Sequence, residues 1–144
     1  MATILELGLE MVRGERELFP VARLLGMAMT ELAPGRAVFE MRADERHHNP
    51  LGTLHGGVYT DLADAAMGWA YAATLGESES FTTVELKINF LRAVRQATLR
   101  AEARVVKAGS TMGYVECEVT DEEGRLVAKS ASTCLKLTKR DGRP

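Results

Sequence analysis

The stretch NPLGTLHGGVYTDLADAA, residues 49–66, opens an apolar part of the chain that continues to about Leu75. From His55 onward, apolar side chains fill so many positions that no polar face remains at the helical period of about 3.6 residues. A helix that is apolar on every side is normally buried. The stretch therefore predicts one long buried helix over roughly residues 55–75.

Segments of alternating polarity flank this helix on both sides. In residues 98–105, Leu99, Ala101 and Ala103 alternate with polar residues, which is typical of a strand with one wet and one buried face. Similar patterns, bounded by turn residues, predict strands at residues 27–32, 36–41, 81–91, 113–119 and 126–137. Short connections favour antiparallel pairing. The predicted fold class is α+β, with an antiparallel β-sheet wrapped around one long central helix.

The chain has 144 residues, which is the length of one ordinary domain. We therefore predict a single domain over residues 1–144. Residues 1–20 are expected to form a helical extension, because apolar side chains recur at helical spacing between residues 3 and 14. Residues 140–144 are expected to form a frayed tail.

The charge balance limits the possible partners. The net charge is −2 and the pI is near 5.9, which argues against a nucleic-acid partner. No run reaches the ~20 apolar residues of a membrane span, and the acidic start lacks the basic region of a secretion signal. Cys117 and Cys134 lack metal-ligand spacing and are predicted to be buried free thiols. We therefore predict a cytoplasmic protein with neither a nucleic-acid nor a membrane partner.

Three histidines, His47, His48 and His55, raise the question of a metal site. Adjacent histidines in an extended loop point apart, and no cysteine or tight acidic cluster accompanies them. We therefore predict that the protein binds no metal.

Asp61 and Asp64 are the only charged residues in the predicted helix. Asp61 lies in the early turns, where the helix dipole stabilises an anion. Asp64 lies deeper, beside Ala63 and Ala65, and burying an unpaired carboxylate is costly. Two explanations of Asp64 stay open: a structural hydrogen bond to a neighbouring strand, or a role as general base or nucleophile.

Gly56 and Gly57 lie where the predicted helix begins. The first backbone N–H groups of a helix lack internal partners, and glycine lets a ligand oxygen approach them closely. Such N–H groups can stabilise a carbonyl oxygen that becomes an oxyanion. A tight loop-to-helix turn is the alternative explanation.

The spacing of Gly56 and Asp64 restricts any joint role. They are eight residues apart, which corresponds to ~12 Å at the helical rise of ~1.5 Å per residue. One carbonyl group cannot contact both residues of the same helix. Either the two features are unrelated, or a two-fold axis places Gly56 of one chain near Asp64 of the other. The second possibility predicts a homodimer with shared sites.

A longer pattern resembles a known family. It consists of Asn49, Gly52, His55-Gly56-Gly57 and Leu62-Ala63-Asp64, followed by Thr83-Val84-Glu85-Leu86 and Asn89-Phe90-Leu91-Arg92. This pattern is similar to that of the hotdog-fold acyl-CoA thioesterases, in particular the phenylacetic-acid-degradation (PaaI-like) branch. The resemblance covers roughly residues 20–138. It implies a hotdog fold, a dimer of dimers and no metal.

The resemblance also implies a role for each matching position. Asp64 would attack the thioester or activate water, with Gly56 of the opposite subunit as the oxyanion donor. Asn49 would hold the thioester or the water, His55 would support the Asn49 loop, and Thr83 would orient water. The predicted substrate-binding residues are Gly57, Gly68 and Arg92. No cofactor is expected, because coenzyme A is part of the substrate.

Two further sets of residues concern the rest of an acyl-CoA. The candidates for the acyl pocket, by their position on the helix, are Met67, Gly68, Trp69 and Tyr71. The cations available for the phosphates of coenzyme A are Arg92, Arg95, Lys107, Lys136, Lys139 and Arg140. Ala93–Ala97 departs from the family pattern, which continues with Pro and a Gly-Asp turn, and Arg95 is the charge that this loop offers instead.

The sequence therefore predicts an enzyme that hydrolyses acyl-CoA thioesters to free acid and coenzyme A. Two alternatives stay open. One is a hydratase or dehydratase acting on acyl thioesters, although such sites usually pair a His with an acid. The other is a non-catalytic acyl-CoA binding module, for which the carboxylate of Asp64 would be unnecessary.

Overall fold

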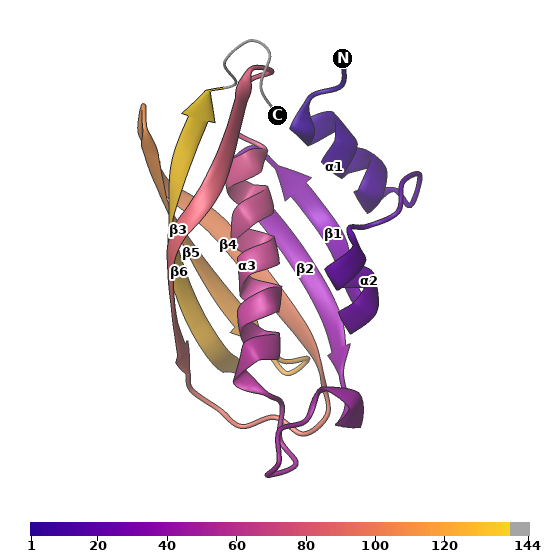
Figure 1. Ribbon diagram of the computed structural model, residues 1–144. Coiled ribbons are helices and arrows are strands. Elements are labelled where there is room, and N and C mark those ends of the chain that lie inside the picture. Colours follow the sequence, from indigo (N-terminus) through magenta and orange to yellow (C-terminus); the bar gives the residue numbers. More distant parts are fainter. Residues whose placement is uncertain (139–144) are drawn as a thin grey trace.

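One antiparallel sheet carries a long helix across one of its faces, as the computed structural model shows for residues 1–138 (Figure 1). The strands follow the order β1-β2-β4-β5-β6-β3, so β1 and β3 are the edges. Their bounds are β1 Met27–Ala33, β2 Arg36–Ala43, β3 Glu79–Phe90, β4 Ala97–Ala108, β5 Met112–Thr120 and β6 Leu126–Thr138. The helices are α1 Ile4–Val12, α2 Pro20–Leu25 and α3 Gly56–Ala72, with a 3-10 turn at Glu45–His47. The predicted α+β architecture is confirmed. The predicted frayed tail lies outside the described residues.

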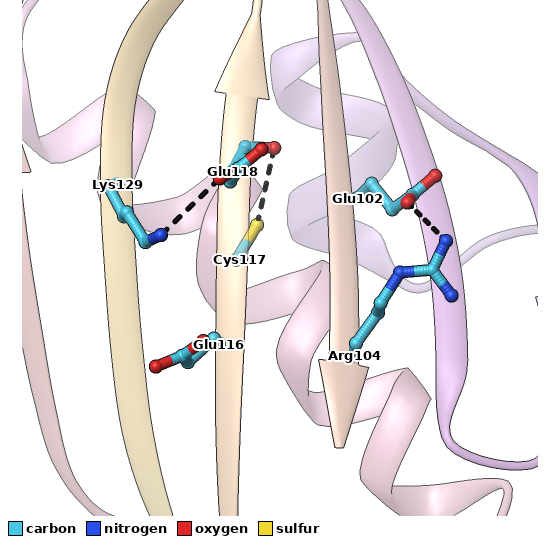
Figure 2. Close-up of a pocket in the computed structure, with 6 residues that line it drawn as sticks. All are labelled: Glu102, Arg104, Glu116, Cys117, Glu118 and Lys129. Carbon is cyan, nitrogen blue, oxygen red and sulfur yellow. Dashed lines mark hydrogen bonds and ion pairs between the residues drawn. The ribbon is translucent and has the colours of Figure 1, made fainter. Parts of the chain in front are cut away.

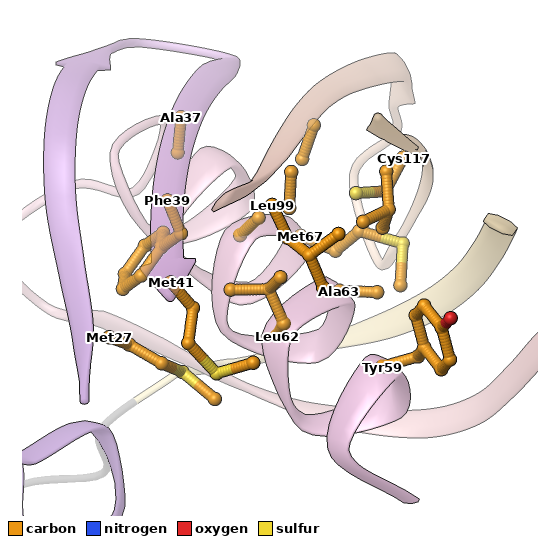
Figure 3. Close-up of a cluster of buried hydrophobic side chains, with 14 of the residues drawn as sticks. Met27, Ala37, Phe39, Met41, Tyr59, Leu62, Ala63, Met67, Leu99 and Cys117 are labelled. Carbon is orange, nitrogen blue, oxygen red and sulfur yellow. The ribbon is translucent and has the colours of Figure 1, made fainter. Parts of the chain in front are cut away.

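The strand pattern read from the sequence is confirmed within a few residues at each end. Neighbouring strands pair antiparallel, and the inward side chains of β2, β4, β5 and β6 form the core with one side of α3 (Figure 3). Phe39, Met41, Leu99 and Met67 are almost completely buried there. Both cysteines are buried free thiols, as predicted, and burial raises the pKa of Cys117 to about 12.

Helix α3 is buried on one side only, which corrects the prediction of a helix buried all round. Residues three and four apart face the sheet, namely Tyr59, Leu62, Ala63, Ala66, Met67 and Ala70. Gly57, Asp61 and Asp64 are exposed on the other side, and Trp69 is partly exposed. The sequence pattern does not indicate this exposed face, because alanine and glycine occur both in buried and in solvent-exposed positions.

The N-terminal segment contains two helices, α1 within the predicted extension and α2 directly after it. Helix α1 begins with a capping box, in which the Thr3 hydroxyl accepts from the Glu6 N–H and the Glu6 carboxylate accepts from the Thr3 N–H. Helix α2 ends at Gly26, whose φ of 80° is readily adopted by glycine. Both helices lie beside β1, on the side of the sheet that carries α3 (Figure 1). They therefore extend the layer that covers this side.

The opposite side of the sheet is charged and its charges are largely paired. A hollow of about 220 Å³ there is lined by Glu102, Arg104, Glu116, Cys117, Glu118 and Lys129 (Figure 2). Arg104 lies 2.7 Å from Glu102, and Lys129 lies 3.3 Å from Glu118. Such ion pairs suit a solvated sheet surface.

Candidate functional site

The loop before α3 is held together by the side chain of Asn49. Its Oδ1 accepts hydrogen bonds from the N–H groups of Leu51 (2.9 Å) and Thr53 (3.2 Å), and its Nδ2 donates to the Thr53 hydroxyl (3.0 Å). One of the two Nδ2 hydrogens is left to donate elsewhere. The position of Asn49 is thus fixed by its own loop.

Helix α3 starts at His55, which is its N-cap residue. The ring Nδ1 of His55 accepts from the Gly57 N–H at 2.9 Å, so the side chain caps the helix and does not hydrogen-bond to Asn49. Within residues 1–138, the Gly56 N–H donates to no acceptor. A free backbone donor therefore stands at the positive end of the helix dipole.

A first cleft, of about 470 Å³, lies at this helix start; we call it the Gly56 cleft. It brings together three of the predicted site residues, Asn49, Gly56 and Arg92. Its full lining is Asn49, Thr53, Leu54, Gly56, Tyr59, Phe90, Leu91, Arg92 and Ala93. The Phe90 ring packs on Gly56 so closely that a Cβ there would lie 2.9 Å from it. The contact with Phe90, rather than only a turn, is thus one reason for glycine at this position.

A second cleft, of about 380 Å³, lies further along α3; we call it the Asp64 cleft. It brings together Asp64 and Gly68. Its full lining is Ile4, Phe19, Asp64, Ala65, Gly68, Trp69, Ala72 and Phe81, so Asp64 is the one charged residue in an otherwise apolar lining. The two clefts share no residue.

The carboxylate of Asp64 has no partner. Among the described residues, none donates a hydrogen bond to Asp64 or forms an ion pair with it, so the structural hydrogen bond considered above is not formed. Its pKa is raised, first because the apolar surroundings remove water from the carboxyl group and second because Asp61 carries a like charge one helical turn away. A carboxylate with a raised pKa in a cleft is typical of a catalytic base or nucleophile.

Thr83 lies on β3 opposite Cys134 of β6, immediately before a bulge between Thr83 and Glu85. Burial raises the pKa of the Cys134 thiol, which lies beside the Thr83 and Ser132 side chains and within electrostatic range of Asp64. Thr83 therefore lies on the Asp64 side of the molecule, although it lines neither cleft.

The acyl-pocket candidates divide into two pairs. Gly68 and Trp69 line the Asp64 cleft, whereas Met67 and Tyr71 are fully buried in the core, which corrects their assignment. Sequence reasoning missed the lining residues Ile4, Phe19 and Phe81. The helical spacing of residues 3–14 was the available signal for Ile4.

The candidate phosphate-binding cations are also divided. Arg92 lines the Gly56 cleft, and Arg95 lies nearby, where its guanidinium donates to the Gly52 carbonyl at 3.3 Å. Lys136 pairs with Glu79 at 3.3 Å. Lys107 lines a separate hollow near the β4–β5 turn. Lys139 and Arg140 lie outside the described residues.

The two histidines of the loop, His47 and His48, form hydrogen bonds with backbone carbonyl groups. Nε2 of His47 lies 3.0 Å from the Leu25 carbonyl oxygen and Nε2 of His48 lies 2.8 Å from that of Arg95. Within residues 1–138, no group of three or more His, Cys, Asp or Glu is placed to hold a metal ion. The described helices include none that is long and apolar enough to cross a membrane.

Comparisons with known proteins identify the family and the fold of the chain. The family model described as the thioesterase superfamily matches residues 51–128. The 1,4-dihydroxy-2-naphthoyl-CoA hydrolase of Listeria monocytogenes is 28% identical over 116 residues, covering 81% of this chain and 94% of the relative. Human acyl-coenzyme A thioesterase 13 is 29% identical over 114 residues, covering 77% and 81%.

A solved structure gives the same result for the fold. A variant of the phenylacetic acid degradation protein PaaI from Thermus thermophilus superimposes with a TM-score of 0.78 and 28% identity, covering 83% of this chain and 100% of that one. The resemblance to the hotdog thioesterases, including PaaI-like proteins, is therefore confirmed, and so is the prediction of an enzyme of the thioesterase type. The matched residues include both the start of α3 and Asp64, and more than half of the chain fits the family. The chain belongs to the thioesterase superfamily.

Proposed function

We propose that this chain hydrolyses acyl-CoA thioesters to a free acid and coenzyme A, without a further cofactor. The observation that carries the proposal is the unpaired carboxylate of Asp64, with its raised pKa, in an apolar cleft of a thioesterase-family chain. The names of two relatives, a naphthoyl-CoA hydrolase and an acyl-coenzyme A thioesterase, support a CoA thioester as the substrate.

The chemistry needs an oxyanion donor and an ionised carboxylate. The Gly56 N–H would stabilise the thioester oxygen as it becomes negative. Asp64 would either take a proton from the water that attacks the carbonyl carbon, or attack that carbon itself to give an anhydride that water then hydrolyses. On either route the C–S bond breaks and the coenzyme A thiolate leaves and is protonated. Asn49 and Thr83 would hold the thioester or water, while Gly57 and Arg92 would contact the rest of the substrate.

The two halves of this machinery lie in different clefts of one chain. We therefore propose that the active enzyme is a homodimer, in which the Gly56 cleft of one protomer faces the Asp64 cleft of its partner. The absence of any shared lining residue and the ~12 Å helical separation support this arrangement. Two such dimers would form the tetramer that is usual in the family.

The direct test is thiol release from acyl-CoA esters ranging from acetyl to long-chain, with phenylacetyl and benzoyl esters included. We expect turnover with at least one ester. Incubation with crotonyl-CoA separates the alternatives, because hydration keeps the thioester whereas hydrolysis frees a thiol. Tight binding of esters without turnover of any would instead support a binding module and contradict the proposal.

The pH dependence follows from the raised pKa of Asp64. Because the ionised form is the active one, kcat/KM should fall as the pH drops through a pKa that lies above the ordinary aspartate value of 3.8. The charge of Asp61 is one cause of that shift, so Asp61→Asn should lower the pKa of Asp64. The acid limb of the kcat/KM profile is then expected to move to lower pH.

The control for this profile is Glu77→Gln, which removes an equal charge from an exposed residue beyond the end of α3. Its acid limb should coincide with that of the wild type. An Asp61→Asn profile that also coincides with the wild type would show that Asp64 does not control the acid limb.

A further inference from the structure

The Asp64 cleft is built by three segments of the chain, of which one is distant in sequence from the other two. Helix α3 provides its floor through Asp64, Gly68 and Trp69, and β3 provides Phe81. The remaining wall comes from the N-terminal segment, through Ile4 of α1 and Phe19 just before α2. The N-terminal segment is thus part of the cleft rather than an appendage.

Helix α1 is seated directly on the indole of Trp69. Gly8, in the middle of α1, is buried, and a Cβ at this position would lie 2.8 Å from Cζ3 of Trp69 and would also overlap the Leu32 side chain. Only glycine lets the α1 backbone approach the ring so closely. The indole is therefore held between α1 and α3.

The other side of the cleft is packed less tightly than the contact at Gly8. A Cβ at Gly68 would lie 3.5 Å from the Phe81 ring, which is ordinary van der Waals contact. The Phe81 ring is itself fixed by an edge-on contact with Tyr71, at a centroid distance of 5.4 Å. The volume of about 380 Å³ lies near the lower end of the ~300–1,000 Å³ of ligand pockets.

We propose that α1 and Trp69 together form the wall of the acyl-binding site that limits the size of the acyl group. This inference rests on the proposed function, and it assigns the Asp64 cleft to the acyl group of the thioester. The lining supports this occupant, because it is apolar except for the carboxylate that would act on the adjacent carbonyl. Aromatic walls at Phe19, Trp69 and Phe81 favour a flat ring or a medium-length chain over a long one.

The first test compares kcat/KM for saturated acyl-CoA esters of increasing length. Trp69→Ala should raise the ratio of long-chain to short-chain kcat/KM by about tenfold or more, since one methylene in an apolar pocket is worth roughly 10–200-fold. Ile4→Trp should lower the same ratio. The control is Leu24→Ala, which truncates a side chain on α2 that is 82% exposed and lines neither cleft. A ratio that is unchanged in both Trp69→Ala and Ile4→Trp would overturn the inference.

The second test needs no turnover and no folding of a Trp69 variant. Trp69 is the only tryptophan of the chain, so its fluorescence reports on this cleft alone. In an Asp64→Asn protein, octanoyl-CoA or phenylacetyl-CoA should change the emission, whereas free coenzyme A should not. If the emission of Trp69 changes when the protein is diluted but does not change with any ester, a second copy of the chain occupies the cleft. That result would overturn the inference.

The two tests separate the possible failures. If no ester is hydrolysed by the wild type but acyl esters change the Trp69 emission, the proposed function fails while the assignment of the cleft stands. If esters are hydrolysed while the length profile of the variants and the emission stay unchanged, only the assignment of the cleft fails.

Discussion

Asp64→Asn is expected to abolish most of the turnover, by a factor of about 10² to 10⁴, which is the usual contribution of a positioned acid or base. Asparagine has nearly the same shape, but it can neither accept a proton from water nor attack a carbonyl carbon. Thiol release under saturating acyl-CoA gives the loss in kcat directly. An Asp64→Asn enzyme with near-normal kcat would remove Asp64 from the mechanism.

The same substitution should leave the fold intact, which excludes a trivial loss of activity. The pKa of Asp64 is higher in the folded protein than its ordinary value, so its ionised form opposes folding. This carboxyl group therefore stabilises the fold only while it is protonated, and the benefit is lost as the pH rises through the folded pKa. At neutral pH, Asp64→Asn is expected to melt at or above the temperature of the wild type. Glu77→Gln, an equal change of charge outside both clefts, should retain full turnover.

Gly56→Pro is expected to lower kcat by about 10² to 10³, the usual effect of removing one oxyanion donor. Proline lacks the N–H but suits the first position of a helix, which Gly56 occupies in α3. Its ring also adds a Cβ near Phe90. Gly56→Ala is the matched variant, because it adds that Cβ and keeps the N–H. A loss of kcat that is equal in both variants would assign the effect to Phe90 rather than to the missing donor.

Mixing Gly56→Pro chains with Asp64→Asn chains tests whether the sites are shared. In a hybrid dimer, one site combines the intact Asp64 of the first chain with the intact Gly56 of the second. Random exchange makes about half of the dimers hybrid, and each hybrid dimer has one intact site out of two. Roughly a quarter of all sites should therefore be intact, and about a quarter of the wild-type activity should return. Subunit exchange is checked by mass spectrometry with one chain isotopically labelled. If the chains exchange and no activity returns, each site is built from one chain.

The elements of the fold could be predicted because local patterns specify them. The alternation in β4 and the mainly apolar composition of α3 are visible without any tertiary information. Asp64 was also visible, since a charge deep in an apolar helix is unusual. The free N–H of Gly56 follows from its place at the helix start.

Other features depended on contacts that a local pattern does not contain. The seating of Gly8 on Trp69 joins residues far apart in the chain, so the wall formed by α1 could not be predicted. The error at Met67 and Tyr71 was avoidable. They share the helix face of Ala63, whereas Gly68 follows Asp64 by four residues and so lies on its face. The phase of α3, set by the positions of Ala63 and Asp64, thus separates the core side of the helix from the cleft side.

The separation of the two clefts also bears on how such a protein can change over generations. Because they share no side chain, and because the N-terminal segment contributes only to the Asp64 cleft, substitutions at Ile4 or Phe19 leave the helix start and Asn49 untouched. If the Asp64 cleft holds the acyl group as proposed, selection can thus remodel the range of acyl groups by mutating a peripheral segment. The proposed oxyanion donor at Gly56 would be inherited unchanged, because it lies in the other cleft.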